Sequence, residues 1–331
     1  MVSSRPLLVL VVPCFNEASL LGEALPRILA EGKALALAHH LEVRLVAVND
    51  GSSDGSEDLL NTLSEQLEGL HALHLTRNFG KEAALMAGLE HALLWPALRL
   101  VVTMDADLQH PPHLLTQFLN VHAQGFAVVE AVKQRRGAES APRRFLAGPF
   151  YRLFEHWSGL PLQGHTDFKL LHVDVVRQLV QMREQGRFYR GMVAWLGFPS
   201  AQITFDVPQR VGGQTQWSSL GLVRYAWGNL LSFSTTPLQL VTWLGALGLL
   251  VGVLGGGKAL WDLMTGQALS GFTTVILLQI IFGSLILVVL GLLGQYLGRI
   301  YEELKARPIY VLKPQLKPHS KPQPHESSVQ D

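Results

Sequence analysis

The stretch Val101-Val-Thr-Met-Asp-Ala-Asp-Leu-Gln-His-Pro-Pro112 places two carboxylates where an apolar run ends. The apolar half predicts a buried strand, and the two prolines predict the start of the next helix. Asp105 and Asp107, with Gln109 beside them, would then occupy the loop after the strand. Mg²⁺ and Mn²⁺ prefer oxygen ligands and take one or two from protein carboxylates while substrate phosphates supply others. The stretch therefore predicts a divalent metal site that faces a nucleoside diphosphate.

The rest of the chain must support this prediction, because an Asp-X-Asp pair is also common among solvated loop acids. Apolar runs predict strands at residues 7–12, 41–48, 73–75 and 98–104, and the segments between them predict helices at 19–38, 58–67 and 82–94. Strands that alternate with helices at this spacing predict a mostly parallel α/β sheet. Ligands of such sheets bind beyond the carboxyl ends of the strands.

Polar residues cluster where these strands end. Glu17 follows the first strand, Asp50 the second, Lys81 the third, and Asp105 and Asp107 the fourth. Because the carboxyl ends of parallel strands share one edge of a sheet, we expect all five side chains on one rim. Nothing else in the composition requires this coincidence, so it favours a binding site over scattered loop acids.

A basic segment follows a fifth predicted strand at residues 127–132. Its cations are Lys133, Arg135, Arg136, Arg143 and Arg144. Two interpretations are open: a solvated basic face, or a phosphate cradle close to a membrane. Further on, isolated charged groups lie between apolar segments at 165–169 and 187–191, where polar contacts of a site are usual. A sixth strand is predicted at 203–207, followed by a glycine loop that carries Arg210.

The apolar residues are concentrated after Pro237, which explains the hydrophobic fraction of 48%. Residues 237–257 and 272–298 carry no charge, and each is long enough to cross about 30 Å of hydrocarbon. We therefore expect two transmembrane helices within residues 236–298. The amphipathic segment 218–235 predicts a helix on the membrane surface, with a buried core helix as the alternative.

The distribution of cations predicts the orientation of this hairpin. The loop at residues 261–271 holds Asp262 and no Lys or Arg, whereas cations are frequent in residues 299–331. The positive-inside rule then puts both termini in the cytoplasm, at the inner membrane. An N-terminal apolar run too short for a signal peptide agrees with a cytoplasmic first domain at residues 1–217. The tail after about residue 313 is rich in Pro, Lys, His and Ser, which is typical of disorder.

The remaining composition excludes some classes of protein. A formal net charge of +1 and the lack of any nucleic-acid motif argue against a nucleic-acid partner. Cys14 is the only cysteine, so the chain forms no intrachain disulfide. Gly248, Gly252 and Gly256 share one face of the first span, and Gly294 and Gly298 share one face of the second. Close packing of the hairpin on itself explains these faces, and a homo-oligomer is the alternative.

Six motifs in this order resemble the family 2 glycosyltransferases. They are Pro13-Cys-Phe-Asn-Glu17, Asn49-Asp-Gly-Ser52, Asn78-Phe-Gly-Lys81, Asp105-Ala-Asp-Leu-Gln109, Thr166-Asp-Phe168 and Arg187-Phe-Tyr-Arg-Gly191. With the two C-terminal spans, the chain looks like the bacterial polyprenyl-phosphate glycosyltransferases, which resemble dolichyl-phosphate mannose synthase. The resemblance covers about residues 6–312. It implies a GT-A (Rossmann-like) fold and a single inverting sugar transfer from a nucleotide sugar, UDP-glucose by default, to polyprenyl phosphate in the lipid bilayer.

The resemblance also implies roles for individual residues. Metal ligands would be Asp105, Asp107 and Gln109. The donor pocket would comprise Pro13, Phe15, Glu17, Asp50, Lys81, Asp105 and Ala106. The acceptor phosphate would meet Lys133, Arg136, Arg144, Arg187 and Arg190. Catalysis would depend on Asp107, Asp167 and Arg210, with Asp167 orienting cations or acting as a base.

Two positions depart from the family pattern. Asn49 stands where an aspartate is usual, which removes one acceptor charge, and Gln216 stands where a lysine is usual. These departures leave open a non-catalytic scaffold that serves a partner enzyme. A processive polysaccharide synthase is a further alternative, but those enzymes generally carry a Gln-X-X-Arg-Trp motif and more spans. Here the corresponding segment is Gln214-Thr-Gln-Trp217.

Overall fold

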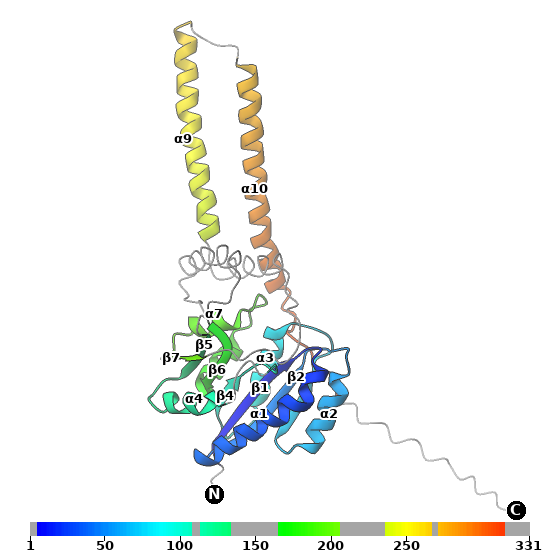
Figure 1. Ribbon diagram of the computed structural model, residues 1–331. Coiled ribbons are helices and arrows are strands. Elements are labelled where there is room, and N and C mark those ends of the chain that lie inside the picture. The colour runs from blue at the N-terminus through cyan, green and yellow to red at the C-terminus, as the bar shows by residue number, and fades with distance from the viewer. Residues whose placement is uncertain (1–4, 108–112, 134–164, 206–235, 267–270, 315–331) are drawn as a thin grey trace, which may run out of the picture.

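The computed structural model describes residues 5–107, 113–133, 165–205, 236–266 and 271–314 (Figure 1). Its strands are β1 (Leu7–Cys14), β2 (Glu42–Asn49), β3 (Leu70–His74), β4 (Leu98–Thr103), β5 (Val128–Lys133), β6 (His165–His172) and β7 (Ser200–Phe205). Its helices are α1 (Ala18–Ala38), α2 (Ser56–Gln66), α3 (Lys81–Ala92), α4 (Leu114–His122), α6 (Val173–Gln181), α7 (Tyr189–Trp195), α9 (Thr236–Met264) and α10 (Phe272–Leu304).

The strands form one seven-stranded sheet in the order β3-β2-β1-β4-β6-β5-β7. Every pairing is parallel except the two made by β6, which runs antiparallel to β4 and β5. The predicted mostly parallel sheet is confirmed. The sequence did not predict β6, because its first half, His165-Thr-Asp-Phe-Lys169, mixes charged and apolar residues without strict alternation.

Helices cover both faces of the sheet, so the central strands are buried on both sides. One core lies against α1, α2 and α4, and the other against α3, α6 and α7. All eight residues of β1 are buried, which explains why it reads as a continuous apolar run instead of an alternating one.

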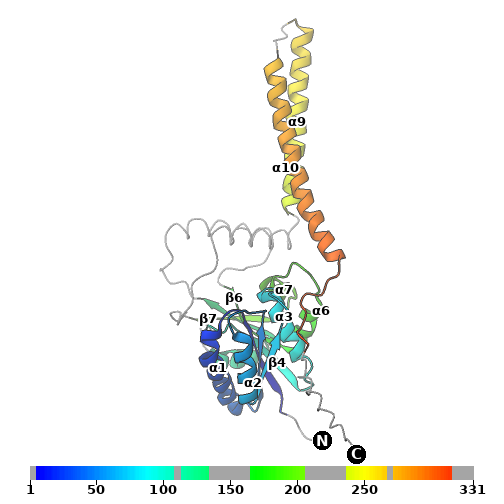
Figure 2. The same ribbon diagram turned by 90° about the vertical axis from the view of Figure 1, so that its right-hand side faces the viewer.

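The two long C-terminal helices extend from one end of this domain (Figures 1 and 2). Strand β1, in dark blue, runs from the far end of the domain toward these helices (Figure 1). The carboxyl ends of the parallel strands therefore point toward α9 and α10. Segments 241–262 and 278–304 are long and apolar enough to cross a membrane. Apolar side chains on them are exposed in the chain alone, for example Leu249 at 70% and Leu287 at 71%, as expected for helices that hydrocarbon would cover.

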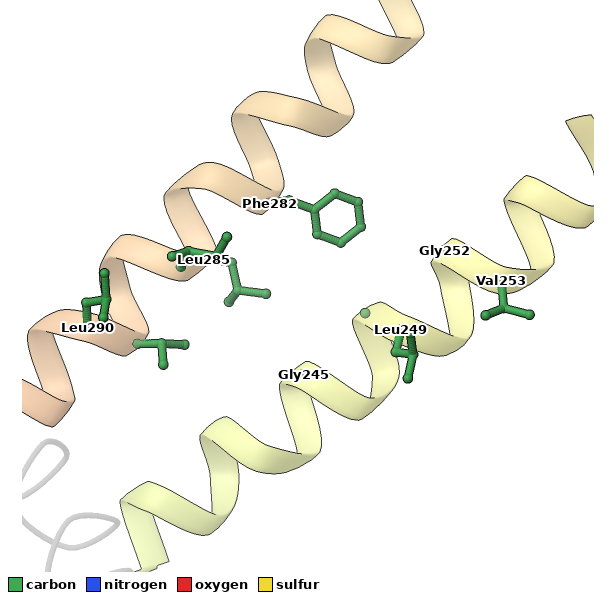
Figure 3. A pocket seen from close by; sticks show the side chains of 10 residues that line it. Gly245, Leu249, Gly252, Val253, Phe282, Leu285 and Leu290 are labelled. Atoms are coloured by element: carbon green, nitrogen blue, oxygen red, sulfur yellow. The ribbon is translucent and has the colours of Figure 1, made fainter.

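Small residues of α9 form a groove that faces α10 (Figure 3). Gly245, Gly248 and Gly252 line it from α9, and Phe282 and Leu285 line it from α10. A Cβ atom at Gly248 would lie 3.6 Å from the Phe282 ring, an ordinary contact distance. This placement supports packing of the hairpin on itself at Gly248, whereas a Cβ atom at Gly252, Gly256, Gly294 or Gly298 would have nothing within 4 Å.

The chain beyond α10 returns to the edge of the sheet. The Thr76 amide donates to the Val311 carbonyl at 2.9 Å, and the Lys313 amide donates to the His74 carbonyl at 2.7 Å. Tyr310 donates its hydroxyl to Glu90 of α3 at 2.5 Å. We call residues 307–313 the C-terminal strap. It pairs with the carboxyl end of β3 at His74 and with Leu75 and Thr76 just beyond it. The predicted surface helix at 218–235 and the tail from residue 315 lie outside the described residues.

Helix α3 packs closely against the sheet at one glycine. A Cβ atom at Gly88 would lie 2.3 Å from Val11 Cγ1 and 3.2 Å from Val48 Cγ2, both in buried strands. We expect Gly88→Ala to lower stability by about 1–3 kcal/mol, because the added methyl forces α3 away from β1. The melting temperature of the full chain in detergent should fall by about 2–4 °C per kcal/mol.

Gly22→Ala provides the matched control for this substitution. Gly22 lies in α1 with nothing within 4 Å of the added Cβ atom, so the change should be neutral or stabilise by about 0.4–1 kcal/mol. Equal melting temperatures for the Gly88→Ala and Gly22→Ala variants would contradict the close packing of α3.

Candidate active site

The carboxyl ends of β1, β2, β3 and β4 meet at one rim of the sheet, as the sequence predicted. Because β6 is antiparallel, its first residues rather than its last reach the same rim: Lys169 pairs with Thr103, the last residue of β4. Asp167, two residues earlier, is thereby brought beside the β4 loop that holds Asp105.

The first two loops of the rim lock each other in place. The Asn16 amide donates to Ser52 Oγ at 2.9 Å, and the Ser53 amide donates to Asn16 Oδ1 at 2.9 Å. The Ala18 amide, at the start of α1, donates to Asp54 Oδ2 at 2.9 Å. These contacts fix the backbone at Glu17, which precedes α1. Phe15, from the same loop, is 37% exposed, whereas Pro13 is buried at the end of β1.

Asp50 orders the loop that leads into α3. Only 3% of the residue is exposed. Its carboxylate accepts from the Phe79 and Gly80 amides at 2.7 and 2.9 Å. Gly51 has φ +67°, and a Cβ atom there would lie 2.3 Å from the Arg77 carbonyl carbon. The aspartate and the glycine are both needed for the close approach of the two loops, which sets where α3 begins.

An ionic network joins four parts of the chain at the rim: α3, the loop after β4, β6 and α7. Lys81 Nζ, from the first residue of α3, lies 2.5 Å from Asp105 Oδ1 and 2.7 Å from Asp167 Oδ2. Arg190 of α7 approaches the same carboxylate at two points, Nε to Oδ1 at 2.7 Å and Nη2 to Oδ2 at 3.1 Å. Burial opposes ionisation of Asp167, but the Lys81 and Arg190 charges hold its pKa well below the usual range.

Negative charge gathers beside this network. Burial first, and then the nearby Asp105 and Asp107 carboxylates, raise the pKa of Glu17 to about 7. Among the described residues, no three His, Cys, Asp or Glu side chains are grouped closely enough to hold a metal ion by themselves. Two aspartates fit an ion that takes one or two protein carboxylates and completes its shell with substrate phosphates. Asp105 and Asp107 therefore suit a divalent cation that arrives with a phosphorylated ligand.

Of the other predicted site residues, the structure describes Ala106, Arg187 and Lys133. Ala106 is 1% exposed, so its side chain packs in the core beneath the loop. Arg187 is 8% exposed and donates to the Met182 carbonyl at 2.8 Å. Carboxylates surround it, namely Glu82, Glu90, Glu184 and Glu303. Lys133 ends β5, which puts its backbone at the rim. Gln109, Arg136, Arg144 and Arg210 lie outside the described residues.

Three residues that sequence reasoning missed support Asp167. The Thr103 hydroxyl donates to the Asp167 carbonyl oxygen at 2.5 Å and lies 2.8 Å from the Tyr189 hydroxyl. Since the Thr103 hydroxyl donates its only hydrogen to the carbonyl, the Tyr189 hydroxyl must be the donor to Thr103 Oγ1. The carboxylate of Glu82 accepts from the Tyr189 amide at 2.9 Å. A threonine at the end of an apolar strand was the one available signal for this set.

The structure also explains the unusual asparagine. Asn49 is fully buried, and its Oδ1 accepts from the Ser52 amide at 3.0 Å. Its Nδ2 lies 3.3 Å from His74 Nδ1, whose other ring nitrogen lies 2.9 Å from Asn61 Oδ1. Burial lowers the pKa of His74, so the ring is neutral and Nδ1 can accept from the amide. An aspartate at position 49 could not donate this hydrogen bond.

The raised pKa of Glu17 predicts a pH dependence of stability. A carboxyl group whose folded pKa exceeds its unfolded value binds more protons in the folded state, so stability falls as pH rises from about 4.5 to about 7. Glu17→Gln removes this loss. With a chelator present, the variant should melt above the wild type at about pH 8 and near it at about pH 5. Glu23→Gln, on the exposed face of α1, is the control, and a similar pH-dependent gain there would contradict the assignment.

Comparison with known proteins agrees with this geometry. A protein of Synechocystis sp. named an uncharacterized glycosyltransferase is 32% identical over 305 residues, covering 92% of this chain and 93% of that protein. The prophage bactoprenol glucosyl transferase homolog of Escherichia coli is 31% identical over 306 residues, covering 92% and 97% of the two chains. The bactoprenol glucosyl transferase of Shigella phage SfII is 32% identical, covering 92% and 96%.

The family model for glycosyl transferase family 2 matches residues 9–179, from β1 to α6. The matched region contains Glu17, Lys81, Asp105, Asp107 and Asp167. All of the rim except Arg190 of α7 thus lies within the region that the family model matches, and the domain has the GT-A fold expected from the sequence. The chain belongs to the family 2 glycosyltransferases and is a glycosyltransferase.

Proposed function

We propose that the protein transfers one glucose from a nucleotide-diphosphate sugar to polyprenyl phosphate, by an inverting reaction at a membrane surface. The ionic rim built by Lys81, Asp105, Asp167 and Arg190 is the observation that carries the proposal, because it lies at the strand ends that point toward the apolar hairpin. The bactoprenol glucosyl transferases named above support the choice of sugar and lipid.

Asp105 and Asp107 would hold the divalent cation, Mg²⁺ or Mn²⁺, together with Gln109. When bound, the cation would supply electrostatic stabilisation of the leaving diphosphate. The residues of the chain align the donor: Glu17 and Phe15 border its pocket, Asp50 holds the loop at its edge, and Lys81 brings a positive charge to the rim. Arg210 would lie near the donor phosphates.

The acceptor needs little activation. A lipid phosphate is largely an anion near neutral pH, because its second ionisation resembles the pKa of about 6 of phosphate monoesters. The pKa of Asp167 is held low by two cations, which makes this carboxylate a weak base. We therefore assign Asp167 the role of orienting Lys81 and Arg190. The site as a whole then aligns the reacting atoms.

The acceptor phosphate would be received by Arg190, Lys133, Arg136 and Arg144. Arg190 is only partly covered, with 36% of its side chain exposed at the rim. Lys133 is included because it is the last residue of β5, and β5 ends at the same edge of the sheet. Arg187 is outside this group, because it is only 8% exposed and its guanidinium donates to the Met182 carbonyl.

In this proposal α9 and α10 span the inner membrane as a hairpin, with the GT-A domain and both termini in the cytoplasm. The cations that follow α10, including Lys305, Arg307 and Lys313, favour this orientation. A domain at the membrane surface can then take a soluble nucleotide sugar from one side and a lipid from the other.

A non-catalytic scaffold is the second candidate, motivated by Asn49 and Gln216. The contact of Asn49 with the neutral His74 weakens the argument for a scaffold, because the buried asparagine has its hydrogen-bond partners. The ionic rim of Lys81, Asp105, Asp167 and Arg190 also does not need an aspartate at position 49. A panel of labelled UDP- and GDP-sugars with membranes and polyprenyl phosphate tests both candidates. A single labelled sugar on lipid supports the transferase, failure with every donor supports the scaffold, and a polymer supports a processive synthase.

Asp105→Ala and Asp107→Ala should each abolish metal-dependent transfer, because each removes a proposed carboxylate ligand from the cation. The measurement is the rate of labelled lipid formation as Mg²⁺ or Mn²⁺ is titrated, with a melting curve to show that each variant folds. Near-normal turnover in either variant would refute the metal assignment.

Asp174→Ala is the matched control for these two variants. Asp174 is 57% exposed and pairs with Arg177 on the surface of α6. It follows the carboxyl end of β6, which reaches the opposite edge of the sheet from Asp105 because β6 is antiparallel. Transfer by this variant should therefore stay close to that of the wild type.

A further inference from the structure

We propose that Glu82 is a positioning residue that fixes the start of α7, and through it the place of Arg190 on Asp167. The inference rests on the proposed function, because it assigns Glu82 a part in aligning the rim for transfer. Glu82 is argued to act through other residues of the chain and is not placed in contact with either substrate.

The first step concerns how α7 begins. Its N-cap residue, Phe188, provides no side-chain hydrogen bond, although the first amides of any helix lack partners within the helix. The Tyr189 amide instead donates to Glu82 Oε2 at 2.9 Å, across 107 positions of sequence. A carboxylate of α3 thus replaces the cap that α7 does not supply for itself.

The second step links this contact to the ionic network. Arg190 is the next residue after Tyr189, and its guanidinium makes the two-point contact with Asp167. The Tyr189 side chain also reaches the rim, because its hydroxyl lies 2.8 Å from Thr103 Oγ1. A shift of the Tyr189 backbone would therefore disturb both the carboxylate of Asp167 and the support of its carbonyl.

The third step concerns where Glu82 itself is held. It lies beside Lys81 in the first turn of α3, and the start of that helix is set by Asp50 through the Phe79 and Gly80 amides. Lys81 contacts Asp105 and Asp167 from the same turn. One turn of α3 therefore carries both the cation of the rim and the anchor of α7, so the two sides of Asp167 keep a fixed separation.

Two substitutions of Glu82, compared by kcat and KM, test whether it positions α7 or only stabilises the fold. Glu82→Gln keeps an oxygen that can accept from the Tyr189 amide, whereas Glu82→Ala removes the acceptor. We expect Glu82→Ala to lower kcat about tenfold or more, since the buried Tyr189 amide loses its acceptor, and to leave the KM for the nucleotide sugar within about twofold. Glu82→Gln should restore most of kcat.

Glu90→Ala is the matched control on the same helix. Glu90 is also a glutamate that accepts a hydrogen bond from a distant segment, in this case from Tyr310 of the C-terminal strap. Its loss should leave kcat within about twofold of the wild type, because its hydrogen bond goes to the strap and Arg187 keeps three other carboxylates nearby. An equal loss of kcat in Glu90→Ala and Glu82→Ala, or a Glu82→Gln variant as impaired as Glu82→Ala, would overturn the proposal.

A measurement that needs no activity separates this inference from the proposed function. In the full chain in detergent, deuterium uptake by amides in residues 187–195 should rise in Glu82→Ala and stay near the wild type in Glu82→Gln and Glu90→Ala. Unchanged uptake in Glu82→Ala overturns the positioning role. If the wild type forms no lipid-linked sugar, the proposed function fails, while this uptake comparison still decides whether Glu82 anchors α7.

Discussion

The ionic contact of Lys81 with Asp105 and Asp167 is the constraint on which the rest of the rim depends. It joins the start of α3, the loop after β4 and the start of β6, and Arg190 adds α7 as a fourth element. Opposite charges placed at the edge of a buried sheet interact more strongly than charges in water. The rim is therefore shaped before any ligand binds, which is the arrangement expected where orientation contributes most of the catalysis.

The antiparallel strand β6 makes this arrangement possible, and a buried ion pair fixes its register. Glu130 of β5 lies directly opposite Lys169 of β6, with Oε1 2.5 Å from Nζ and the lysine fully buried. Burying such a pair is costly, and separating its members would cost more. A slip of β6 by one residue would strand both charges in the core, so the pair holds Asp167 at the correct height on the rim.

The same domain is tied to the apolar hairpin by contacts at the end of α10. The Gln185 amide donates to Glu303 Oε1 at 2.7 Å, and its side-chain amide donates to the Arg307 carbonyl at 2.6 Å. The C-terminal strap then pairs with the segment that ends β3 and reaches His74, the neighbour of Asn49. Gln185 lies four residues before α7, so the end of the apolar hairpin contacts the chain close to the helix that carries Arg190.

The sequence alone determined the alternation of strands and helices, the two apolar helices and the polar strand ends, because these depend on local periodicity and composition. It also placed Glu17, Asp50, Lys81 and the two aspartates at one edge, since parallel strands leave no other choice. Only the tertiary structure decided the direction of β6, the partners of Asp167 and Arg187, and the anchoring of α7 by Glu82. Each of these rests on contacts between residues far apart in the chain, and no local pattern encodes such contacts.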